Sequence, residues 1–216
     1  MSATMSSVRP TNTAPTGLKP LVFLLCLLPL GLLIWRGFEA GLGANPVETL
    51  EHATGDWALR LLLLTLCATP LRQLSGWSWP LRLRRMLGLY TFFYASVHMA
   101  LYFTLDLELD FYMLGNEVLK RPYLSVGFLA WALLIPLALT STDRMIRRLG
   151  RRWKSLHRSV YVIGVLAVLH YLWLVKADVR EPLLYGAILI VLLGWRAWRE
   201  RRDRKGGRRS QAVRTV

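Results

Sequence analysis

The chain has 216 residues, of which 54% are hydrophobic, and it carries 28 Lys and Arg against 13 Asp and Glu. A strongly basic chain can indicate nucleic-acid binding, but here the charges lie between long apolar runs rather than on one soluble face. Composition therefore excludes an ordinary soluble domain and favours an integral membrane protein with one domain. Cys26 and Cys67 lie inside apolar runs and form no disulfide or metal motif, so we interpret both as small core residues.

The first 20 residues are rich in Ser, Thr and Pro, and we interpret 1–20 as a disordered cytoplasmic tail. The apolar run that follows has the character of a signal peptide but is not closed by a small-residue cleavage site. We therefore expect this run to be retained as the first membrane span.

Six apolar segments follow one another, and each is expected to form a spanning helix. A bilayer core requires about 20 helical residues, a length that the third, fourth and fifth segments reach unaided. The first, second and sixth are short between charges and need terminal Lys and Arg side chains to extend to the interface; the second is the weakest. The segments are 21–35, 59–71, 86–105, 122–142, 156–175 and 182–198. The prediction is an all-α bundle of six transmembrane helices over 21–199, with a basic cytoplasmic tail at 200–216 and no evident internal repeat.

The charges orient this bundle in the membrane. If the N-terminus is cytoplasmic, 22 of the 28 Lys and Arg lie inside, in 1–20, 72–85, 143–158 and 196–216, while 10 of the 13 acids lie outside. Because basic residues are retained on the cytoplasmic side, this distribution predicts a multi-pass protein with both termini in the cytoplasm.

Two of the four histidines lie deep inside uncharged segments. His98 lies in 86–105 and His170 in 159–175. At 1.5 Å of rise per residue they lie about 18 Å and about 21 Å from the inner ends of their helices, so they reach similar depths. A titratable side chain in hydrocarbon is costly unless it is bonded, and two histidines at matched depth favour axial ligation of one haem iron. The alternatives are a satisfied core histidine or a proton relay.

The neighbours of the two histidines agree with a flat ligand. Ala95 and Ala167 each precede a histidine by three residues and share its helix face, where a small side chain leaves room for a macrocycle. Aromatic residues flank both histidines: Tyr94, Tyr102, Tyr171 and Trp173.

The remaining candidates are weaker. His157 lies at the inner end of the fifth segment and is either an interfacial histidine or a ligand to a second haem, although it does not share a face with His170. Arg84 lies near the face of His98 and suits a haem propionate better than iron, since guanidinium does not deprotonate. His52, beside Glu51, is expected to be a solvated loop residue.

Two motifs resemble a known family, the ferric-reductase-like transmembrane domain and, within it, the MsrQ (YedZ) proteins. They are Arg84-Arg85-Met86-Leu87-Gly88-Leu89 followed by His98, and Trp153-Lys154-Ser155-Leu156-His157-Arg158 followed by Tyr161 and His170-Tyr171-Leu172-Trp173. The resemblance covers nearly the whole chain from the first to the sixth apolar segment.

The resemblance implies a haem b membrane subunit of the bacterial inner membrane, with one haem or two. Such subunits pass electrons from quinol or a cytoplasmic flavin reductase to a periplasmic molybdopterin subunit, MsrP-like, which reduces methionine sulfoxide in oxidised proteins. Sulfoxide chemistry would then lie in the partner, and FMN is associated with the family although no FMN motif stands in this sequence. The rival hypothesis is a cofactor-free transporter or structural subunit whose buried histidines relay protons.

Overall fold

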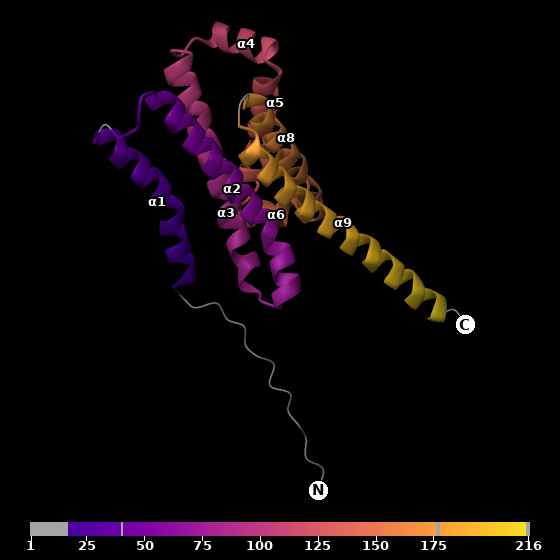
Figure 1. The fold of residues 1–216 in the computed structure, drawn as a ribbon. Helices are drawn as coiled ribbons and strands as arrows, with labels where there is room; N and C mark the ends of the chain where they lie inside the picture. Colours follow the sequence, from indigo (N-terminus) through magenta and orange to yellow (C-terminus); the bar gives the residue numbers. More distant parts are fainter. Residues whose placement is uncertain (1–16, 40, 176–177, 215–216) are drawn as a thin grey trace.

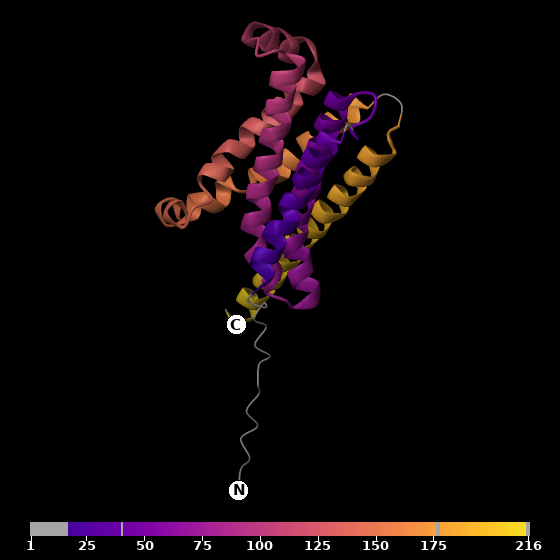
Figure 2. The same cartoon turned by 90° about the vertical axis from the view of Figure 1, so that its left-hand side faces the viewer.

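A computed structural model of the chain describes residues 17–39, 41–175 and 178–214, without the side chains of Phe111 and of residues 204–214. Within these ranges the fold is helical throughout (Figures 1 and 2). Its elements are α1 (Leu18–Phe38), α2 (Pro46–Ser75), α3 (Trp79–Leu101), the π-helical turn η1 (Tyr102–Asp106), α4 (Phe111–Lys120), α5 (Pro122–Leu139), α6 (Asp143–Leu149), α7 (Arg151–Leu156), α8 (Ser159–Leu174) and α9 (Arg180–Arg214).

The predicted tails at 1–20 and 200–216 stay predictions, and each borders on a long helix. Residues 1–16 of the predicted N-terminal tail lie outside the described residues, but α1 already begins at Leu18. At the other end α9 continues to Arg214, well beyond the expected span at 182–198. Since Arg and Lys are good helix formers, a basic sequence can prolong a spanning helix after its apolar part ends.

Five of the six expected spans are long and apolar enough to cross a membrane, and α2 is the one that does not qualify on composition. Its N-terminal half carries four charged residues, Glu48, Glu51, Asp56 and Arg60. Arg60 lies 3.2 Å from the Asp56 carboxylate and donates from Nε to the Tyr185 hydroxyl, so this charge has partners inside the protein. A helix that faces other helices on several sides needs less apolar surface than one that faces lipid.

Capping side chains explain where α2 begins and ends. The Asn45 side chain accepts a hydrogen bond from the Glu48 N–H, and Pro46 occupies the first helical position, where its missing N–H costs nothing. At the other end Gly76 has φ of 73°, a left-handed conformation that stops the helix. The chain can then reverse within a few residues into α3, which lies antiparallel along α2.

The bundle is organised around two helix pairs. α2 packs along α3, and α5 packs along α8, which follows after the short helices α6 and α7. The beginning of α1, the turn between α2 and α3 and the far end of α9 lie at one end of the bundle (Figure 1). We name this end the inner end, after the orientation that the charges predict, and the opposite end, where α4 lies, the outer end. This placement agrees with an even number of membrane crossings between the beginning of α1 and the end of α9.

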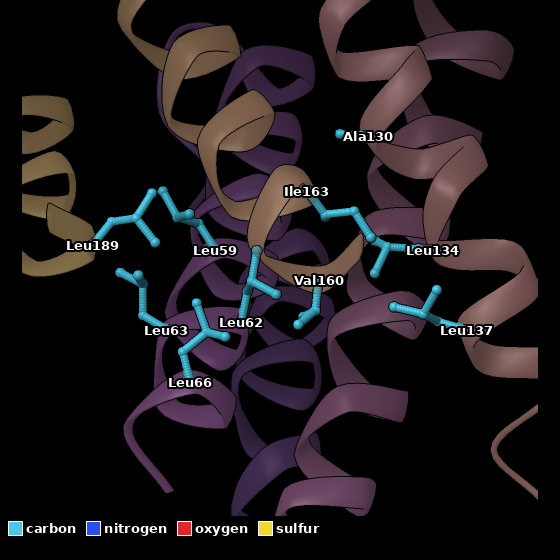
Figure 3. Packing of buried hydrophobic residues seen from close by; sticks show 10 residues of the cluster. All are labelled: Leu59, Leu62, Leu63, Leu66, Ala130, Leu134, Leu137, Val160, Ile163 and Leu189. Carbon is cyan, nitrogen blue, oxygen red and sulfur yellow. The ribbon is translucent and has the colours of Figure 1, made fainter. Parts of the chain in front are cut away.

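A leucine-rich core joins the two pairs. Figure 3 shows side chains from α2, α5, α8 and α9 converging, with Ile163 and Leu134 extending toward each other. Ile163 is 1% exposed and Leu62 is 2% exposed, so the core excludes both solvent and lipid at these side chains. Several of these residues also form the floor of the cavity described next.

Candidate functional site

His98 on α3 and His170 on α8 lie opposite each other across a cavity between α2, α3, α5 and α8. Their ring centroids are 6.3 Å apart and the ring planes meet at 74°. The structure therefore brings together the two histidines that the sequence placed at matched depth. The core residues Leu62, Leu134 and Ile163 close the cavity toward the inner end of the bundle.

Each histidine is held by a main-chain carbonyl of the other helix in its pair, α2 for His98 and α5 for His170. Nδ1 of His98 lies 2.9 Å from the Glu51 carbonyl oxygen, and Nδ1 of His170 lies 2.8 Å from the Tyr123 carbonyl oxygen. Because a carbonyl oxygen can only accept, both Nδ1 atoms carry the proton and donate it. Each Nε2 then keeps its lone pair, which is the arrangement that metal-bound histidines show in proteins.

A glycine lies against each imidazole. A Cβ on Gly55 would come within 3.3 Å of the His98 ring, and a Cβ on Gly127 would come within 2.7 Å of His170 Nδ1. Contacts below 3 Å require something to move, so the ring of His170 occupies space that only glycine leaves open. The cavity is thus shaped around the positions of the two rings.

The separation of the rings fits a single metal ion between them. With metal–nitrogen bonds of about 2.0–2.1 Å, and each ring nitrogen about 1.2 Å from its centroid, two imidazoles on opposite sides of one metal would have centroids about 6.4–6.6 Å apart. Among the described residues no group of three or more His, Cys, Asp or Glu could hold a metal ion. Two histidines alone would leave further coordination positions to a non-protein group, and the four nitrogens of a haem would supply them.

The outer rim of the cavity is polar. Glu51 lies in the first turns of α2, outside the expected span at 59–71, and its Oε1 is buried without a hydrogen-bond partner. Arg121 also lines this rim and forms an ion pair with Glu117. A ligand in the cavity would therefore meet polar groups at its outer edge and hydrocarbon at its inner edge.

The other candidates lie elsewhere. His157 stacks on Trp153 with centroids 3.9 Å apart, and its Nε2 is buried without a partner, but it lines neither described cavity. Arg84 lines a second cavity near the inner end of the bundle and does not line the histidine cavity, so its pairing with a haem propionate stays a prediction. His52 lines the outer rim of the histidine cavity and lies 3.9 Å from Glu48.

Sequence reasoning did not find Gly55, Gly127 or the two carbonyl groups. A carbonyl is present at every residue, so no residue type marks its role. The glycines did carry a signal, because an isolated glycine inside an apolar helix often marks a close approach by another group. Its meaning depends on which side chain approaches, and that information comes only from the packing of the helices.

Together these features define a helical membrane protein with two intramembrane histidines paired across a cavity. The family model for the ferric reductase like transmembrane component matches residues 54–168. A protein-methionine-sulfoxide reductase heme-binding subunit MsrQ from Xanthomonas euvesicatoria is 56% identical over 196 residues, 88% of this chain and 90% of the relative.

More distant relatives carry the same name. The MsrQ subunit of Xanthomonas oryzae is 53% identical over 208 residues, 94% of this chain and 95% of the relative. That of Herminiimonas arsenicoxydans is 46% identical over 203 residues, 91% of this chain and 93% of the relative. The chain therefore belongs to the MsrQ family of ferric-reductase-like membrane proteins.

Proposed function

We propose that this protein is a b-type haem membrane subunit that holds one haem between His98 and His170. The observation that carries the proposal is the pair of imidazoles 6.3 Å apart, each with Nδ1 bonded to a carbonyl and Nε2 left to bind a metal. The relatives are named heme-binding subunits, which agrees with this assignment. The haem is non-covalent, because no Cys-x-x-Cys-His stands in the sequence.

The chain would supply ligation, burial and position, while haem, when bound, supplies one-electron transfer. The two carbonyl bonds fix the ring orientation, and the leucine-rich floor excludes water from the inner side of the cavity. Ala95 and Ala167 line the walls with small side chains, which suits a flat macrocycle. Among the described residues no histidine faces His157 as a second ligand, so the proposed stoichiometry is one haem per chain.

We propose α2 as the sixth span and both termini in the cytoplasm of a bacterial inner membrane. Support comes from the 22 of 28 basic residues that would lie inside and from the position of the beginning of α1, the turn between α2 and α3 and the far end of α9 at one end of the bundle (Figure 1). Reporter fusions after Gly115 and at the C-terminus test this topology. They should report opposite sides, and the same side for both would contradict it.

The proposed acceptor is a periplasmic molybdopterin methionine sulfoxide reductase subunit, MsrP-like, that docks on the outer end. The relatives are named as subunits of a protein-methionine-sulfoxide reductase, which implies a partner that carries out the reduction. Three acids lie at that end, from the last residue of η1 to the N-cap of α4, and would attract a basic docking surface: Asp106, Glu108 and Asp110.

The proposed donor side is the inner cavity, of about 450 Å³, between α2, α3, α8 and α9. It is lined by Arg84, Arg158, Arg196 and Arg199, together with Tyr161, Trp195, Glu200 and Asp203. The Arg199 Nε is buried without a hydrogen-bond partner, and Arg196 lies 4.4 Å above the Tyr161 ring. Guanidinium and aromatic groups suit a phosphate-bearing aromatic donor such as FMN, or a quinol.

The haem proposal is tested on the purified protein. We expect a reducible Soret band, one haem per chain in a pyridine haemochrome assay and a low-spin bis-histidine signal in electron paramagnetic resonance. A protein that inserts in the membrane but binds no haem when it is expressed with ample haem would contradict the proposal. That result would favour the cofactor-free histidine relay.

The electron route needs a second experiment. Haem reduced in membranes should be reoxidised when the MsrP-like partner and methionine sulfoxide are added together, and charge reversal at Asp106, Glu108 and Asp110 should slow the reaction. Charge reversal at Arg147 and Arg148, on the inner α6, is the matched control and should leave the rate unchanged. Reoxidation without the partner, or an effect only from the α6 variant, would place the exit on the wrong side.

A further inference from the structure

The two histidine contacts repeat with one constant offset. In both, 47 residues separate the carbonyl residue from the histidine that it holds. Glu51 and Tyr123 are 72 positions apart, and so are His98 and His170. In both, the glycine that faces the ring follows the carbonyl residue by four positions, one helical turn.

The same offset extends over the whole cavity. Of the 28 residues that line it, 24 form pairs 72 positions apart, with one member on α2, α3 or η1 and the other on α5 or α8. Pairing this complete would not arise from four unrelated helices. The four unpaired residues are Asp106, Leu114, Val118 and Arg121, and all of them lie between α3 and α5 at the outer end.

Residue identity supports the pairing. Of the 12 pairs, 5 are identical, although little else in the two segments agrees. Besides the glycines and the histidines, the identical pairs are Ala58 and Ala130, Leu62 and Leu134, and Ala95 and Ala167. The shared pattern is Gly-x-x-Ala-x-x-x-Leu on the first helix of each pair and Ala-x-x-His on the second.

The repeat does not follow from a common connection. A short turn at Gly76 joins α2 to α3, whereas α6 and α7 join α5 to α8. The matched spacing is therefore kept at the cavity although the inner ends are built differently. Since α3 and α8 run in the same direction, a rotation about an axis along the helices relates the two pairs.

We propose that the cavity is a pseudo-twofold site made of two equivalent half-sites, and that Gly55 and Gly127 are the positioning residues that seat one imidazole in each. Each half-site consists of a carbonyl, a glycine one turn later and a histidine on the following spanning helix. The inference rests on the proposed haem function, and it explains why the same kinds of contact hold His98 and His170. The unpaired outer residues break the symmetry at the rim and give an asymmetric ligand a single orientation.

The test substitutes each glycine by alanine in the full-length protein and titrates the haem-free form with haem. In Gly127→Ala the new Cβ would overlap His170, so we expect roughly 10–100-fold weaker haem binding, the range found when groups that orient metal ligands are removed. In Gly55→Ala the approach is 3.3 Å, so the ring can shift slightly and the loss should be smaller. The matched control is Gly88→Ala on α3, whose Cβ would meet Thr65 at an ordinary 3.9 Å.

Two further readouts separate positioning from general stability. The g values of the low-spin signal should change in Gly55→Ala and Gly127→Ala but not in Gly88→Ala, while the melting temperatures of the haem-free proteins stay close to one another. If Gly127→Ala does not accumulate in the membrane, the milder Gly55→Ala carries the test.

The outcomes distinguish the two proposals. A wild-type protein without haem contradicts the proposed function itself. A wild-type protein with bis-histidine haem whose two glycine variants match Gly88→Ala in affinity and in g values overturns only the half-site inference. A g-value change in both glycine variants, with the control unchanged, supports it.

Discussion

The two histidine-bearing helix pairs hold their imidazoles in the same way with different side chains. In α2 and α3 the carbonyl belongs to Glu51, a residue of the polar rim, and in α5 and α8 it belongs to Tyr123, an aromatic residue. Because the side chains differ while the carbonyl contacts agree to within 0.1 Å, the main chain sets the ligand geometry. The side chains of Glu51 and Tyr123 can therefore differ while both line the cavity.

The pairs also differ in how the rest of the protein supports them. On α3, Tyr94 is fully buried and its hydroxyl donates to the Cys26 carbonyl and accepts from the Leu30 N–H, on either side of Pro29 in α1. On α8 the corresponding residue is Leu166, which packs against the leucine-rich core. At this position the first half-site is therefore supported by a polar anchor to α1, and the second by apolar packing.

The largest expected effect comes from removing a ligand. His98→Ala and His170→Ala should each abolish the low-spin haem while the protein still inserts, because one remaining imidazole cannot complete the bis-histidine site. Absorbance and haemochrome assays on the two purified variants measure this. Full low-spin haem in either variant would show that its histidine is not a ligand and would break the equivalence of the pairs.

The next effect tests the polar anchor of the first pair. Tyr94→Phe leaves two buried main-chain groups of α1 without the hydroxyl, at a cost of about 1–3 kcal/mol. Tyr90→Phe is the matched control. The Tyr90 hydroxyl donates one hydrogen bond to the Phe23 carbonyl and, unlike the Tyr94 hydroxyl, does not bridge a donor and an acceptor of α1. Thermal unfolding in detergent should rank Tyr94→Phe below Tyr90→Phe. Equal melting temperatures would refute the anchor.

A smaller effect is expected where the two pairs meet. The Trp131 indole on α5 donates to the Ser96 hydroxyl on α3 over 3.1 Å, a bond between the two halves. Ser96→Ala should lower stability by about 0.5–1.5 kcal/mol, as for a typical internal hydrogen bond, and leave the haem spectrum unchanged. A spectral change in this variant would mean that side-chain contacts between the pairs also set the ring orientation.

The smallest effects are expected at the carbonyl residues themselves. Glu51→Gln and Tyr123→Phe keep the main-chain carbonyl, so the haem g values and haem content should match those of the wild type. The same electron paramagnetic resonance measurement used for the glycine variants checks this. A large shift in either variant would assign the positioning role to the side chain instead of the backbone.

Sequence reasoning predicted the features that depend on residue type and spacing along one helix. Charge-free segments and matched depth predicted the pairing of His98 and His170, and the all-helical membrane fold is confirmed. The expected span at 59–71 stays a prediction, because α2 is not among the helices apolar enough to cross a membrane and carries charges such as Asp56 and Arg60. The internal repeat was missed because its identical residues are scattered and become neighbours only when four helices surround one cavity.

Chemical rescue of the missing ligands tests the central claim most directly. His98→Gly and His170→Gly each remove one imidazole and leave a space that free imidazole can fill. If the half-sites are equivalent, both variants lack low-spin haem alone, and added imidazole restores low-spin spectra that match each other and approach the wild type. Low-spin haem in either variant without imidazole, or rescue in only one of them, would contradict a single haem held by two equivalent half-sites.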